Sequence, residues 1–137
     1  MNSLFNQVLY LFFNKKCDIP IGKKKGKLII PKIISDGSKK IKFAFIAGFF
    51  DADGCIFEKQ KYISFTQADK KFLMNLSNLL NSLRISTRPI YVTRKELGIT
   101  YTFSIRFKAL KIFLDNIKVV HPDRVRRMNK LKNMIER

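Results

Sequence analysis

The sequence has few of the residues that build metal clusters and disulfide frameworks. It contains a single histidine, His121, and two cysteines, Cys17 and Cys55, which lack the spacing of a zinc motif. A zinc site is therefore not expected, and the cysteines are interpreted as free thiols of an intracellular protein. No stretch has the pattern of a secretion signal with a small-residue cleavage site, which agrees with that location.

Long apolar runs and acidic residues are also scarce. No apolar run reaches the ~20 residues that a membrane-spanning helix needs. Only 10 residues are Asp or Glu against 28 Lys or Arg, so the net charge is +18. That excess predicts a polyanionic partner, with nucleic acid favoured and an anionic membrane as its rival. The 46% hydrophobic content, with 13 Phe, predicts one folded domain.

The most informative stretch is residues 41–54, which reads I-K-F-A-F-I-A-G-F-F-D-A-D-G. Its apolar residues recur at helical spacing. Small residues form one stripe along this predicted helix: Ala44, Ala47, Gly48 and Ala52. Such a stripe lets a second helix approach closely. Gly54 is expected to end the helix in a left-handed conformation.

Two carboxylates, Asp51 and Asp53, lie at the C-terminal end of this helix. The helix dipole disfavours an anion there by roughly 0.3–1 kcal/mol. A divalent cation would reverse the penalty, because carboxylate and carbonyl oxygens are the ligands that Mg²⁺ takes. The alternative is that both are solvated turn residues ahead of a glycine.

Residues 46–54, I-A-G-F-F-D-A-D-G, resemble the nine-residue signature of LAGLIDADG homing endonucleases, and the chain holds one copy. The resemblance implies that two signature helices pack along the two-fold axis of a homodimer. The implied interface residues are Ala44, Ala47, Gly48 and Asp51. It also implies that Asp53 holds Mg²⁺ (or Mn²⁺), with the backbone carbonyl of Ala52 as a second ligand. Asp51 is expected to shape the helix end rather than to bind the metal.

The same resemblance assigns further catalytic residues. Thr66-Gln67, at the end of a predicted strand, looks like the family's Thr-Gln pair that positions solvent near the metal. Lys108, in F-K-A-L, resembles the active-site lysine of the family. Lys71 is a further candidate, with Lys70 as its substitute. The alternatives are that Gln67 is a strand-end residue and Lys108 a capping or solvated lysine. His121, which precedes a proline, is interpreted as a turn residue rather than a general base.

The first 40 residues are expected to be an appendage to an endonuclease domain at 41–137. Residues 3–13 predict a short helix packed on the domain, and their lysine-free polar face disfavours the alternative of a membrane-surface helix. Residues 17–40 predict a loop with one short strand at Lys27–Ile30.

The lysines of this loop predict an arm that contacts phosphates, with a solvated loop as the alternative. The lysines assigned to DNA are Lys23, Lys24 and Lys25. The segment also resembles the stretch upstream of the second signature helix in intein-encoded LAGLIDADG enzymes. The chain is therefore similar to the rear half of such an enzyme.

After Gly54 the apolar period changes from helical to alternating. The pattern predicts a hairpin of strands 55–58 and 62–66, a helix capped by Asp69, a second hairpin of strands 87–93 and 99–106, a helix at 108–116 and a terminal helix after Pro122. This order predicts an α+β domain in which helices cover one face of a four-stranded antiparallel sheet. It is the αββαββα-type arrangement of the family, with the sheet as a DNA-binding saddle.

The other face of the sheet is expected to bind nucleic acid. Its basic candidates are Lys61, Arg88, Arg94 and Arg106. A two-stranded antiparallel ribbon fits the major groove of DNA. Tyr62, Tyr91 and Tyr101 supply aromatic rings, so single-stranded RNA stays open as an alternative ligand.

Together these features predict a homodimeric, Mg²⁺-dependent homing endonuclease. We expect it to bind double-stranded DNA and to cut both strands of a long pseudo-palindromic site by phosphodiester hydrolysis. The resemblance to the family implies that the cut would mobilise the intron or intein that encodes the protein. The alternative is a non-cutting protein of the same fold, either an intron RNA maturase or a DNA-binding regulator. The intact Asp53, Gln67 and Lys108 favour the endonuclease.

Overall fold

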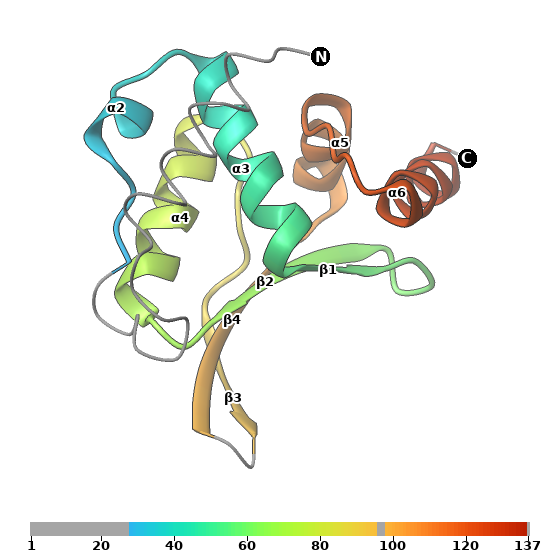
Figure 1. The fold of residues 1–137 in the computed structure, drawn as a ribbon. Coiled ribbons are helices and arrows are strands. Elements are labelled where there is room, and N and C mark those ends of the chain that lie inside the picture. Colours follow the sequence, from blue (N-terminus) through green and yellow to red (C-terminus); the bar gives the residue numbers. More distant parts are fainter. Residues whose placement is uncertain (1–27, 96–97, 137) are drawn as a thin grey trace.

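The computed structural model describes residues 28–95 and 98–136 (Figure 1). The expected helix at 3–13 and the lysines at 23–25 lie outside the described residues. The elements in chain order are α2 (Lys32–Ser35), α3 (Lys39–Asp53), β1 (Gly54–Phe57), β2 (Tyr62–Gln67), α4 (Lys70–Ser82), β3 (Tyr91–Lys95), β4 (Gly98–Arg106), α5 (Phe107–Asn116) and α6 (Pro122–Ile135).

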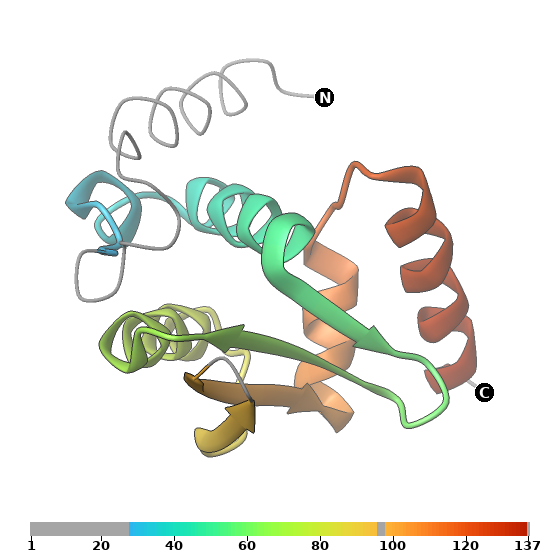
Figure 2. The ribbon, with the colours of Figure 1, turned by 60° about the horizontal axis from the view of Figure 1, so that its bottom comes forward.

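The strands form a single antiparallel sheet in the order β1-β2-β4-β3. Figures 1 and 2 show α3, α4 and α5 on one face of this sheet, while α6 lies beside α5 and the β1–β2 hairpin. No helix among the described residues covers the opposite face, which we call the open face. The predicted α+β class and the one-sided layer of helices are confirmed.

The core lies between the sheet and the helices. Strand alternation turns Ile63 and Phe65 toward the helices, opposite Ile105 and Phe103 of β4, and all four are fully buried. The predicted apolar stripe of α4 is buried against them: Phe72, Leu73, Leu76, Leu79 and Leu80. Aromatic rings from α3 pack on this layer, with Phe50 edge-on to Phe65 at 5.4 Å.

The junction between α3 and β1 differs from the expectation. Gly54 is extended, with φ −78° and ψ 153°, so the predicted left-handed helix end is wrong. A Cβ at this position would lie 2.0 Å from Cδ1 of Phe50. Glycine is required here because the buried Phe50 ring packs directly on the backbone of residue 54.

The N-terminal part of the described chain also departs from the prediction. Residues 28–30 form no strand, and the short helix α2 follows Pro31. Proline cannot donate to a strand ladder but suits the start of a helix. Ile34 of α2 is 3% exposed and belongs to the core. Ser38 accepts a hydrogen bond from the Ile41 N–H and caps α3, so the expected boundary after residue 40 falls inside this helix.

The second hairpin is shorter than predicted on one side. β3 begins at Tyr91 rather than at residue 87. Pro89 interrupts the ladder because it has no N–H to donate. The Arg88 N–H still donates to the Ser104 carbonyl at 2.8 Å, so the segment before β3 runs along β4. Among the described residues, no helix is long and apolar enough to cross a membrane.

Candidate functional site

Two of the predicted catalytic residues meet where α3 ends. Asp53 is the last residue of α3, and Gln67 is the last residue of β2. Because Gly54 pairs with Phe65, the start of β1 lies beside the end of β2. Nε2 of Gln67 donates to Oδ2 of Asp53 at 2.8 Å, and the Asp53 side chain remains exposed. The site therefore has an accessible carboxylate whose orientation is held by a neutral amide.

The predicted catalytic Lys108 does not lie beside this pair within the chain. Gln67 is opposite Tyr101 in the sheet, whereas Arg106, which immediately precedes α5, is opposite Tyr62. From Tyr101 to Arg106 the strand rises roughly 17 Å at ~3.4 Å per residue. Because β4 runs antiparallel to β2, the end of β4 lies beside the start of β2. Lys108, which follows the end of β4, is therefore at the opposite end of the sheet from Gln67.

The other lysine candidates lie at the Gln67 end of the sheet. Lys71 is exposed in the first turn of α4, which begins shortly after β2. The ammonium of Lys70 lies 5.6 Å from the centre of the Tyr101 ring, and Tyr101 is the strand partner of Gln67. Lys70, the substitute candidate, thus contacts the residue that pairs with Gln67 in the sheet.

Asp51 is engaged within the chain. Its Oδ2 accepts a hydrogen bond from the Val120 N–H at 3.0 Å, which joins the end of α3 to the linker between α5 and α6. Its Oδ1 is buried and has no hydrogen-bond partner. The contact fixes Asp51 within one chain, and its expected roles at the helix end and in the dimer interface stay predictions.

Arg124, which was not among the candidates, binds the residue that follows Asp53. One amino group (Nη2) of Arg124 donates to the Gly54 carbonyl at 2.6 Å, and the guanidinium lies 5.4 Å from the centre of the Phe50 ring. The two partners are 70 positions apart. No local pattern signals such a contact, because it depends on where α6 packs.

A second cationic cluster ties α6 to the β1–β2 hairpin. Arg127 donates to Glu58 Oε1 and to the Ile56 carbonyl, both at 2.7 Å, and Lys130 lies 3.5 Å from Glu58 Oε2. The hydrogen bond from Arg127 lowers the pKa of Glu58, with the charges of Arg127 and Lys130 acting in the same direction. These contacts hold α6 beside the junction that carries Asp53.

The small-residue stripe of α3 is partly accessible. Ala44 and Gly48 are half-buried and Ala52 is exposed, whereas Ala47 is 9% exposed and belongs to the edge of the core. Three of the small residues thus keep surface that a second helix could cover. The dimer interface stays a prediction.

The open face carries short hydroxyl side chains at its centre. Thr102 bonds to Thr66 at 2.8 Å and to Thr93 at 2.9 Å through side-chain oxygens, which links β2, β4 and β3. Nearer the β1–β2 turn, the Tyr62 ring stacks on Phe57 with 4.5 Å between centroids, and the Arg106 guanidinium lies 3.9 Å from the Tyr62 centroid. This face is polar at its centre and aromatic and cationic toward one end.

The predicted DNA-binding residues are not all on this face. Lys61 is exposed in the β1–β2 turn, Arg88 is exposed before β3, and Arg106 is half-buried at the end of β4. Arg94 is opposite Ile99 in the register of β3 and β4, and its role in DNA binding stays a prediction.

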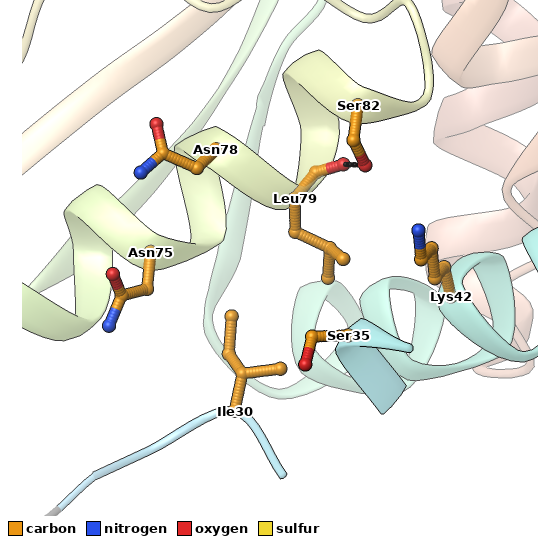
Figure 3. Close-up of a pocket in the computed structure, with 7 residues that line it drawn as sticks. All are labelled: Ile30, Ser35, Lys42, Asn75, Asn78, Leu79 and Ser82. Carbon is orange, nitrogen blue, oxygen red and sulfur yellow. Dashed lines mark hydrogen bonds between the residues drawn. The ribbon is translucent and has the colours of Figure 1, made fainter. Parts of the chain in front are cut away.

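A shallow pocket lies elsewhere, between the α2 region and α4 (Figure 3). It is lined by Ile30, Ser35, Lys42, Asn75, Asn78, Leu79 and Ser82. These described residues include no carboxylate and no strand residue, so this pocket is separate from the Asp53–Gln67 site. In the part of the chain that the structure describes, no three His, Cys, Asp or Glu side chains gather as a metal cluster.

Comparison with known proteins agrees with this fold. A family model described as a LAGLIDADG-like domain matches residues 40–118. The probable translation initiation factor IF-2 of Methanocaldococcus jannaschii is 36% identical over 95 residues, which are 69% of this chain and 8% of that protein. The tRNA-splicing ligase RtcB of Pyrococcus furiosus is 31% identical over 104 residues, 66% of this chain and 11% of that protein. The chain thus spans about a tenth of the length of these relatives.

Proposed function

Because this chain belongs to the LAGLIDADG family, we propose that it is a site-specific endonuclease that hydrolyses phosphodiester bonds of double-stranded DNA. The observation that carries the proposal is the 2.8 Å hydrogen bond between Gln67 and Asp53. It orients an exposed carboxylate at the end of α3, beside the end of β2, in a chain of net charge +18. A carboxylate of this kind is suited to a metal-dependent reaction on a polyanion.

The residues at this helix end fit a hard divalent cation such as Mg²⁺ or Mn²⁺. Asp53 supplies a carboxylate, and the carbonyls of the last helical turn, including that of Ala52, lack partners within a helix. When bound, the cation would supply Lewis acidity and an activated water for attack on phosphorus. Gln67 would keep Asp53 in the binding orientation, and its amide oxygen would orient solvent.

A second copy of the chain would complete the site. Among the described residues of one chain, Asp53 is the carboxylate that is accessible at this point, since Asp51 is bound to the Val120 N–H. The accessible stripe of Ala44, Gly48 and Ala52 on the same helix supports a contact between two α3 helices, which would bring two Asp53 residues together. We therefore propose a homodimer that cuts both strands of a pseudo-palindromic site of about 20 bp, two helical turns.

The two relatives support the idea that this chain is a domain inserted into a host protein by a mobile element. A translation initiation factor and an RNA ligase share no activity in their names, yet each contains a segment similar to this chain that covers 8% or 11% of its length. A segment common to two unrelated proteins is best explained as an insertion. We propose that the chain is the endonuclease part of an intein, or of a related mobile element, and that it does not share the activities of these two proteins.

One observation favours a second candidate, a non-cutting nucleic-acid-binding protein of the same fold. The active-site lysine expected at position 108 lies at the far end of the sheet from Asp53. If neither Lys70 nor Lys71 supplies the missing charge, the chain would bind nucleic acid as a maturase or regulator without cutting it.

Incubation of the purified protein with a randomised duplex library, in Mg²⁺ and then in Ca²⁺, tests the proposal. Sequencing of the ends should give a two-fold-symmetric cut motif in Mg²⁺ only, and light scattering should give the mass of a dimer. Binding without cuts in Mg²⁺ would favour the second candidate. An asymmetric motif or a monomeric mass on DNA would contradict the homodimer.

A further inference from the structure

Phe107, between β4 and α5, combines an unusual backbone with an exposed ring. Its φ is +58°, in the left-handed region that bulky residues rarely adopt, and its side chain is 79% exposed. The ring therefore gains little from the core that would offset the strain. A strained residue without a packing role is a starting point for a functional hypothesis.

The surroundings of the ring are strongly basic. Phe107 lines two adjacent hollows together with Arg106 and Lys108. The first is completed by Ser86, Thr87, Arg88 and Ala109, and the second by Gln60, Lys61, Leu110, Lys111, Met134 and Ile135. The described residues of the two linings include five Lys or Arg and no Asp or Glu. An apolar ring surrounded by cationic side chains is suited to duplex DNA. The ring can pack on deoxyribose and on apolar atoms of the base edges, and the cations can bind the flanking phosphates.

Arg106 connects Phe107 to the open face of the sheet. Its guanidinium packs on the Tyr62 ring at 3.9 Å, and Tyr62 stacks on Phe57 at 4.5 Å. Its Nε also donates to the Ser104 hydroxyl at 3.4 Å. The residue before Phe107 is thus fixed to the proposed DNA-binding face, and Phe107 follows it directly after the end of β4.

We propose that Phe107 contacts duplex DNA at the outer end of each half-site. Its ring packs on deoxyribose and base edges, while Lys61, Arg88 and Lys108 contact phosphates on either side. The ring has no hydrogen-bonding group, so it reads DNA through apolar contact and groove shape. This inference rests on the proposed DNA binding and is independent of cutting.

The sheet sets the distance of this contact from the cut. The ~17 Å from Tyr101, beside Gln67, to Arg106 corresponds to about five base pairs at ~3.4 Å each. The Phe107 contact therefore lies about five base pairs or more outward from the phosphates next to Asp53. In that position Lys108 is a phosphate contact of the flank.

Selection of bound duplexes from a randomised library, with Ca²⁺ in place of Mg²⁺, tests the proposal. The variant is Phe107→Gly, because glycine accepts the positive φ and removes the ring without a cost to the fold. We expect a roughly tenfold weaker affinity, equivalent to about 1.4 kcal/mol, and lost preference only at the outer positions. The melting temperature should be unchanged or higher. Ile33→Ala, which removes a 67% exposed side chain from α2, is the control and should bind as wild type does.

Equal affinity and an unchanged motif for Phe107→Gly would overturn the proposal. So would a loss confined to single-stranded RNA, which would mark the ring as a stacking platform for RNA. If the outer positions depend on Phe107 and the wild type never cuts in Mg²⁺, this inference holds and the proposed nuclease activity fails. Absence of duplex binding by the wild type would overturn both.

Discussion

Gln67 fixes one oxygen of Asp53: Nε2 of the amide donates to Oδ2 of the carboxylate at 2.8 Å, across 14 positions of the sequence. The bond joins the C-terminal end of α3 to the end of β2. Asp53 would otherwise be a free side chain at a helix terminus whose dipole disfavours it. The amide offsets part of that penalty and selects one orientation of the carboxylate before any ligand arrives.

Loss of this amide should impair cutting without impairing DNA binding. In Gln67→Ala, Asp53 loses its hydrogen-bond donor, and partners of this kind typically contribute 10–100-fold to metal affinity or activity. We expect a decrease of that order in single-turnover cleavage, with part recovered at higher Mg²⁺. Asn75→Ala, which removes an exposed amide of α4 in the separate pocket of Figure 3, is the control. Wild-type cleavage by Gln67→Ala would show that the bond has no role in the reaction.

Arg124 should contribute more to stability than its neighbour Arg126. Arg124 donates to the Gly54 carbonyl from a partly buried position, whereas Arg126 pairs with Asp123 at the surface. Arg124→Ala should lower the free energy of unfolding by about 1.5–3 kcal/mol, as for hydrogen bonds to charged groups. Arg126→Ala should lower it by about 0–1 kcal/mol. Urea unfolding measures both, and equal losses would contradict the assigned role of Arg124.

Stability should decrease in acid through Glu58. The hydrogen bond from Arg127 and the nearby charges lower the pKa of Glu58 in the folded state. Its contribution is therefore present above the unfolded-state pKa, about 4.3, and is lost as the pH falls through the lower folded value. Glu58→Gln should destabilise the protein at neutral pH and flatten the decrease in melting temperature below about pH 4. If the melting temperature of Glu58→Gln fell as steeply in acid as that of the wild type, the decrease would come from other carboxylates and the role given to Glu58 would be wrong.

The local pattern of the sequence predicted most of the fold. The alternation through Ile63 and Phe65 and the stripe from Phe72 to Leu80 identify a strand and a helix from their periods alone. The start of β3 was missed although Pro89 signals it, since a proline excludes a regular ladder at that point. Position 54 requires glycine because the Phe50 ring packs on its backbone. The sequence does not reveal this contact, although the two residues are only four positions apart.

The candidate site was predicted only where a motif marks it. Asp53 and Gln67 follow from the signature resemblance, and the structure brings them together. Lys108 matched a local string, but its position depends on the direction of β4 relative to β2. Arg124 reaches Gly54 from 70 positions away, and no local signal could identify it.

The most direct test of the proposed function changes one atom in each of two acids that are two positions apart. Asp53→Asn and Asp51→Asn each replace a carboxylate oxygen by an amide nitrogen, and Asp51→Asn keeps an oxygen to accept from the Val120 N–H. Strand scission in Mg²⁺ and duplex affinity in Ca²⁺ are measured for both variants. The account predicts that Asp53→Asn binds DNA but does not cut it, while Asp51→Asn still cuts. Cleavage at the wild-type rate by Asp53→Asn would contradict the assignment of the catalytic site.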